Sequence, residues 1–160
     1  MLLSNRLFVN QHSISNTGAT RVQKLTVDAI KAEVQRFWSA FSNKQSDQLM
    51  EFYSPESSVF GSASTRPEPG RLAAARRQRE YFHAKATIRA TPGMIDVILL
   101  GDHAAVASYT FTFHASKVAT GLNAAVEEDI RNGRASQVFG YDPEGKLRIV
   151  YEHLSHVDKG

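Results

Sequence analysis

The segment GRASQVFGYDPEGKLRIVYEHLS, residues 133–155, indicates a β-hairpin and decides the fold of the chain. Its centre, DPEGK, has Asp at the first position of a turn, Pro at the second and Gly at the fourth. This is the pattern of a type I turn whose glycine closes a bulge. Such a turn pairs Asp142 with Lys146. The two flanking runs are therefore predicted to be neighbouring antiparallel strands of one sheet.

The pairing of Asp142 with Lys146 also predicts which hairpin residues share a face of the sheet. Because side chains alternate between the two faces of a strand, six residues are expected together: Ala135, Gln137, Phe139, Ile149, Tyr151 and His153. The opposite face carries the charged Arg134, Arg148 and Glu152, so the first face is the one expected to be buried. A slip of one residue would reverse the arrangement and place Arg134 and Glu152 inside.

The residues before the hairpin predict helices first and then strands. Residues 26–41 form an amphipathic helix pattern, with Thr26 in the N-cap position, and its apolar stripe comprises Val27, Ile30, Val34, Phe37, Trp38 and Phe41. A second helix is expected at 46–53, a short strand at 57–64, a third helix from 71, and strands at 94–100 and 104–115. Residues 115–132 are expected to form an irregular connection. This order predicts an α+β fold.

The third helix contains the densest basic run of the chain, RLAAARRQRE at residues 71–80. On a helical wheel, Arg76, Arg77, Glu80 and His83 fall on one side and apolar residues fall on the other. No aromatic side chain interleaves with the charged ones, as a nucleic-acid surface would require. The run is therefore interpreted as a solvated helix face, and no nucleic-acid partner is expected.

The composition excludes several classes of function. The chain has 160 residues, a net charge of +3 and no cysteine, so it is most simply one domain without disulfides, thiolate nucleophiles or cysteine-bound zinc. The six histidines lack metal-ligand spacing, and neither a metal nor another cofactor is expected. No run reaches the roughly 18 apolar residues of a membrane span, so a cytoplasmic protein is expected. Residues 1–24 are rich in Ser, Asn, Thr and Gln and are expected to form a flexible arm.

The hairpin resembles the SnoaL-like branch of the nuclear transport factor two-like superfamily, which includes ketosteroid isomerase and scytalone dehydratase. The matching residues are Gly133, Arg134, Ser136, Val138, Phe139, Gly145, Ile149, His153 and Ser155. Leu147 stands where the family has an aromatic residue, and Tyr151 where it has a first histidine. The resemblance implies one domain over residues 25–160. It implies a cone-shaped, curved antiparallel sheet, with three helices from the N-terminal half packed on its concave face.

The family's cone also implies a small-molecule pocket and a dimer. Gln137, Tyr151 and His153 are expected to point into the cone, and the apolar lining is expected to come from Trp38, Tyr53, Phe60, Tyr109, Phe111 and Phe139. The expected ligand is a small hydrophobic molecule of the polyketide or steroid kind. Relatives pair through the outer face of the sheet, where Val106, Ser108 and Thr110 form an uncharged patch, so a homodimer is expected.

Three classes of function remain open from the sequence. The first is acid-base catalysis of the isomerase, cyclase or dehydratase type, with His153 as the base and Tyr151 as a hydrogen-bond donor. The second is binding of a ligand without catalysis. The third is an assembly domain that resembles the association domain of calcium/calmodulin-dependent kinase II, in which an arginine stands where this chain has Gln137.

Overall fold

The computed structural model describes residues 24–62, 64–117 and 128–157. The expected N-terminal arm and most of the expected connection at 115–132 lie outside the described residues. The elements in chain order are α1 (Val27–Ser42), α2 (Ser46–Phe52), β1 (Tyr53–Phe60), β2 (Glu68–Pro69), α3 (Arg71–Ala84), β3 (Lys85–Leu100), β4 (Ala104–Lys117), β5 (Glu128–Tyr141) and β6 (Leu147–His156). None of the helices in the described part of the chain has the length and apolar character of a membrane span.

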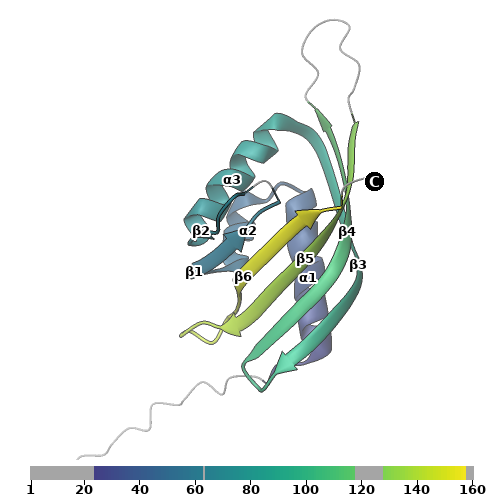
Figure 1. Cartoon of the computed structure of the whole chain (residues 1–160). Helices are drawn as coiled ribbons and strands as arrows, with labels where there is room; N and C mark the ends of the chain where they lie inside the picture. The colour runs from purple at the N-terminus through teal and green to yellow at the C-terminus, as the bar shows by residue number, and fades with distance from the viewer. Residues whose placement is uncertain (1–23, 63, 118–127, 158–160) are drawn as a thin grey trace, which may run out of the picture.

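The six strands form one curved, open sheet in the order β2-β1-β6-β5-β4-β3. The three helices lie on the concave side of this sheet (Figure 1), so the predicted α+β fold is confirmed. One detail differs, because β1 and β6 pair in parallel and the sheet is therefore mixed. The hairpin fixes the direction of β6, and β1 reaches the free edge of that strand from a distant part of the chain.

Helix α1 supplies the centre of the core. The Thr26 hydroxyl caps it by accepting a hydrogen bond from the Ala29 amide at 3.2 Å. Four residues of the predicted apolar stripe are buried: Ile30, Val34, Phe37 and Trp38. On α3, Arg76, Glu80 and His83 are exposed, while Ala74, Ala75 and Phe82 are buried, as the wheel predicts. Both helices therefore present their apolar sides to the sheet.

Strand β3 is longer than the sequence predicts. The strand was expected only at 94–100, but it begins at Lys85, directly after α3, and continues through Thr91, Pro92 and Gly93. The pairing with β4 shifts between Pro92 and Ile95, so these residues form a bulge inside the strand. Proline is tolerated there because β3 lies at the edge of the sheet and its outer backbone groups need no partner strand.

The hairpin turn forms as predicted. The Asp142 amide donates to the Lys146 carbonyl at 2.9 Å, and Gly145 takes the positive φ of 77° that the closing bulge requires. The Asp142 carboxylate accepts hydrogen bonds from the Lys146 and Glu144 amides and from the Arg148 side chain. Arg148 was expected on the outer face, but its side chain folds over the turn and is buried against the carbonyl of Glu51.

Strand β6 contains a second bulge that changes the predicted register. Phe139 pairs with Ile149 as predicted, but Val138 then pairs with Tyr151, and Val150 becomes an extra residue. Because side chains alternate with a period of two, every later residue of β6 takes the opposite face from the prediction. The expectation that Tyr151 and His153 point into the cone is therefore wrong.

The bulge places a different side chain of β6 inside. Glu152 pairs with Gln137 and is only 1 % exposed, whereas Tyr151 and His153 are exposed. Arg134 stays on the outer face, because the extra residue lies in β6 alone and the alternation of β5 is regular. The residues of β5 thus face as predicted, whereas the residues of β6 after Val150 face as they would after a slip of one residue.

Candidate functional site

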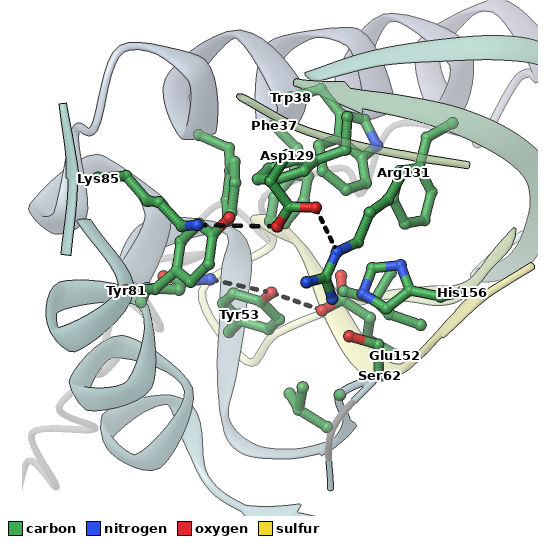
Figure 2. Close-up of a pocket in the computed structure, with 17 residues that line it drawn as sticks. Phe37, Trp38, Tyr53, Ser62, Tyr81, Lys85, Asp129, Arg131, Glu152 and His156 are labelled. Atoms are coloured by element: carbon green, nitrogen blue, oxygen red, sulfur yellow. Dashed lines mark hydrogen bonds and ion pairs between the residues drawn. The ribbon is translucent and has the colours of Figure 1, made fainter. Parts of the chain in front are cut away.

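The inward faces of the sheet and two helices enclose a cavity of about 350 Å³. Strands β1, β4, β5 and β6 form one side of it, α1 and α3 form the other, and Lys85 at the start of β3 also lines it (Figure 2). The lining residues are Phe37, Trp38, Phe41, Tyr53, Val59, Gly61, Ser62, Gln78, Tyr81, Lys85, Phe111, Phe113, Asp129, Arg131, Glu152, Leu154 and His156. Most of the lining surface is aromatic or aliphatic, and a few polar groups interrupt it.

The aromatic wall is tightly packed around Trp38. Its ring stacks on Phe111 at 4.8 Å between centroids, and Phe37 meets it edge to face at 5.3 Å. Phe111 lies over Gly133 of the neighbouring strand, with which it pairs. A Cβ atom at Gly133 would come within 2.1 Å of the Phe111 ring, so the position has no space for a side chain. Gly133 therefore allows the wall to form.

A buried chain of hydrogen bonds leads from α1 to the carboxylate of Glu152. The Trp38 indole donates to the Tyr109 hydroxyl at 2.9 Å, and that hydroxyl donates to the Gln137 carbonyl oxygen at 2.8 Å. The Gln137 amide group then donates to Glu152 Oε2 at 2.6 Å. Tyr53 donates to the other carboxylate oxygen, Oε1, at 2.9 Å. The network thus aims two side-chain donors at one buried carboxyl group in the cavity wall.

The electrostatics of Tyr109 agree with this direction of donation. Burial raises the pKa of its hydroxyl well above the ordinary value, and the nearby charge of Glu152 raises it further. Tyr109 therefore keeps its proton and serves as a donor to Gln137. Glu152 is the group in this network that can accept a proton.

A second group of polar residues in the cavity wall lies around Asp129. The Asp129 carboxylate accepts a hydrogen bond from Arg131 Nε at 2.7 Å and lies 3.7 Å from Lys85 Nζ (Figure 2). The Lys85 ammonium also lies 5.6 Å from the centre of the Tyr81 ring. Burial, followed by the charge of Asp129, raises the pKa of Tyr81 to about 12, so Tyr81 is a neutral side chain here.

The structure brings some of the predicted site residues together. Trp38, Tyr53 and Phe111 line the cavity, as expected. Gln137 and Tyr109 are buried behind the lining and belong to the hydrogen-bond network. Four of them, Trp38, Tyr53, Tyr109 and Gln137, belong to the hydrogen-bond network of Glu152, a residue that was expected on the outer face.

The remaining predicted residues lie away from the cavity. Phe139 is fully buried in the core below it. Tyr151 and His153 lie on the outer face of β6, and the His153 ring meets Phe60 of β1 at 5.4 Å between centroids. An acid-base role of Tyr151 and His153 inside the cone has no support from this arrangement.

Sequence reasoning missed the charged residues of the cavity. Asp129 and Arg131 precede the predicted hairpin, in the stretch that was interpreted as an irregular connection. They face inward because β5 extends back to Glu128 and pairs regularly with β4, which sets Arg131 opposite Phe113. Counting back from Phe139 in steps of two would have found both residues. Glu152 required knowledge of the bulge at Val150.

The architecture defines the class of protein, an α+β cone with an internal cavity, and the sequence comparison defines the family. A family model of the SnoaL-like domain matches residues 30–159. The chain belongs to the SnoaL-like domain family, and its structural neighbours lie in the nuclear transport factor 2-like, or ketosteroid isomerase-like, superfamily. The resemblance noted in the hairpin is therefore confirmed. A search of curated proteins finds no match.

Solved structures share the fold at low sequence identity. A protein from Streptomyces avermitilis, proposed to be a dehydratase of the nuclear transport factor 2-like family, has a TM-score of 0.72 at 14% identity, covering 82% of this chain and 97% of its own. A nuclear transport factor 2-like superfamily protein from Salmonella enterica serovar Typhimurium has a TM-score of 0.68 at 21% identity, covering 83% and 92%. A protein from Xanthomonas campestris, proposed to be a calcium/calmodulin-dependent protein kinase II association domain, has a TM-score of 0.66 at 19% identity, covering 86% and 96%. At these identities the likeness concerns the fold alone.

Proposed function

We propose that the protein binds a small, largely apolar molecule in the cavity between the sheet and helices α1 and α3. The observation that carries this proposal is the cavity itself, whose volume of about 350 Å³ is framed by Trp38, Phe111 and Phe113. Ligand sites are usually apolar cavities of roughly 300–1,000 Å³ with a small number of convergent polar groups. Here the polar groups are Glu152 with its donors and the cluster around Asp129.

Binding of a neutral apolar ketone tests the proposal directly. Trp38 is the only tryptophan of the sequence, and it lies in the cavity wall, so its fluorescence reports occupancy of the cavity. We expect 2-tetralone to quench this fluorescence in a saturable manner. Leu154→Phe, which adds volume inside the cavity, should weaken binding by about 10-fold, since overpacking of a filled site costs on the order of 1–3 kcal/mol.

The matched control is Val150→Phe, because Val150 lies on the same strand, is exposed at the bulge and does not line the cavity. This variant should bind 2-tetralone as the unmodified protein does. Quenching that is not saturable, or equal weakening by both variants, would contradict binding in the cavity.

A second candidate function is proton transfer within the same cavity, and Glu152 is the residue that favours it. Its carboxylate is buried beside the ligand space and is oriented by Tyr53 and Gln137. A positioned carboxylate can remove a proton from a carbon next to a carbonyl group, which is the first step of many isomerisations and eliminations. We assign the role of base to Glu152 in place of His153. The structural neighbour from Streptomyces avermitilis that is proposed to be a dehydratase agrees with chemistry of this kind.

We also propose that the protein is a homodimer that pairs through the outer face of the sheet. An apolar row crosses four adjacent strands there, formed by Ile98, Val106, Val138 and Tyr151. The next row runs from Asp96 through Ser108 and Ser136 to His153, and its two central residues are uncharged serines. A continuous apolar row of this kind on a sheet face is typical of a surface that another protein covers.

Sedimentation equilibrium at micromolar concentration should give a mass of about twice the 17.7 kDa of the chain. Val138→Arg should shift the protein to the monomer, because the new charge would be buried without a partner in the interface. Gln35→Arg adds the same side chain at an exposed position of α1 and should leave the dimer intact. A monomeric mass for the unmodified protein would contradict the proposal.

A further inference from the structure

The cluster around Asp129 carries more positive than negative charge. Lys85 and Arg131 both interact with the single carboxylate of Asp129. The Lys85 side chain is 11% exposed and that of Asp129 is 24% exposed, so these two lie largely out of water, whereas the Arg131 side chain is half exposed. Two cations on one anion leave this cluster of three side chains with one unit of positive charge. In such surroundings an unbalanced charge is costly, and a bound anion would stabilise it.

Arg131 has the geometry to hold such an anion. Its Nε donates a hydrogen bond to Asp129. Its two terminal nitrogens donate to no acceptor among the described residues. Figure 2 shows its guanidinium group projecting into the cavity between Asp129 and His156. The side chain is 51% exposed, so the fork remains accessible to a molecule that enters the cavity. A guanidinium fork binds a carboxylate through two parallel hydrogen bonds.

The two polar groups of the cavity differ in the ligand charge that they favour. An anion placed near Glu152 would meet a second buried negative charge, whereas an anion placed at Arg131 would complete the charge balance of the cluster. The aromatic side chains of Trp38 and Phe111 offer an apolar surface for the rest of the molecule. A molecule with one acidic end and an apolar body therefore fits the cavity with its acidic end at Arg131.

We propose that the ligand of this cavity is a small apolar carboxylic acid, bound as its anion, with the carboxylate on the terminal nitrogens of Arg131 and the apolar body against the aromatic wall. The inference rests on the proposed ligand-binding function and specifies its ligand class. Arg131 is then the residue that determines specificity for acids.

A pair of compounds with the same shape and different charge tests this inference. At neutral pH, 3-phenylpropanoate is an anion, and 3-phenylpropanamide is its neutral counterpart. Isothermal titration calorimetry on the full chain should give at least about 10-fold tighter binding of the acid, because a charge-assisted hydrogen bond is worth roughly 1.5–3 kcal/mol. Arg131→Gln should remove most of this preference while leaving the affinity for the amide within a few-fold.

Arg134→Gln is the matched control, because Arg134 lies on the same strand and is exposed on the outer face of the sheet. This variant should keep the full preference for the acid. Equal affinity for the acid and the amide in the unmodified protein would overturn the acid specificity and leave the apolar binding function standing. A preference that survives Arg131→Gln would overturn the role of Arg131. Absence of saturable binding by both compounds would overturn the binding function and the inference together.

Discussion

Replacing Glu152 with glutamine is expected to lower, by about 100-fold or more, the rate at which the protein exchanges the α-hydrogens of 2-tetralone for solvent deuterium. Glutamine has the shape of glutamate and can still accept the hydrogen bond from Tyr53, but it cannot take a proton. Removal of a positioned base typically costs 10²- to 10⁴-fold in rate. Proton magnetic resonance in deuterium oxide measures the exchange, and Trp38 fluorescence shows separately whether the variant still binds the ketone.

The outer-face residues supply the control for this prediction. His153→Asn and Tyr151→Phe should leave the exchange rate nearly unchanged, because both side chains lie on the far side of β6 from the cavity. Loss of exchange in His153→Asn, with Glu152→Gln unaffected, would contradict the assignment and would indicate the regular register of the hairpin. A protein that binds 2-tetralone without accelerating exchange would be a binder and not a catalyst of proton transfer.

The second large effect is expected from Gly133→Ala, a change of one methyl group. The new Cβ atom would overlap the Phe111 ring, and that ring cannot retreat easily because it stacks on Trp38. Overpacking of a core costs on the order of 1–3 kcal/mol. For a domain of this size the loss corresponds to a decrease in Tm of roughly 2 to 12 °C, which differential scanning calorimetry measures.

Two further variants identify the cause of the loss. Gly140→Ala makes the same change on the same strand. There the added Cβ would lie 3.6 Å from its nearest neighbour, an atom of Val150, which is an ordinary van der Waals contact. It should keep Tm or raise it slightly, since alanine restricts the unfolded chain. Combining Gly133→Ala with Phe111→Leu should destabilise the protein by less than the sum of the two single changes, because a shorter side chain leaves room for the methyl group. Strict additivity would show that the clash is not the cause.

The sequence was sufficient for those parts of the fold that local patterns determine. Helix α1 and its buried stripe follow from the spacing of Ile30, Val34, Phe37 and Trp38, and the DPEGK turn follows from the conformational preferences of Asp, Pro and Gly. The resemblance of the hairpin to the SnoaL-like family identified the superfamily. These signals act over a few residues, so they hold without knowledge of the rest of the chain.

The candidate site depended on contacts that a single strand does not encode. Whether Val150 pairs with β5 or forms a bulge depends on which of the following residues of β6 finds hydrogen-bond partners when it is buried. Glu152 finds two donors inside, from Tyr53 of β1 and Gln137 of β5. The inward position of Asp129 and Arg131 depended on the length of β5, which extends into a stretch whose composition resembles a loop. The sequence thus predicted three residues of the wall, Trp38, Tyr53 and Phe111, but it placed Tyr151 and His153 inside where the structure has Glu152.

The bulge at Val150 also determines how this chain is to be compared with its relatives in evolution. Deletion of Val150 would make β6 regular and leave Tyr151 outward and Glu152 inward, so the strand can lose this residue without exchanging the two faces. An alignment without a gap at this point would match Glu152 with an outward residue of any relative whose strand is regular. After position 150, residues that share an alignment column need not share a face of the strand. A functional residue of the family therefore corresponds to the residue of this strand that lies on the same face.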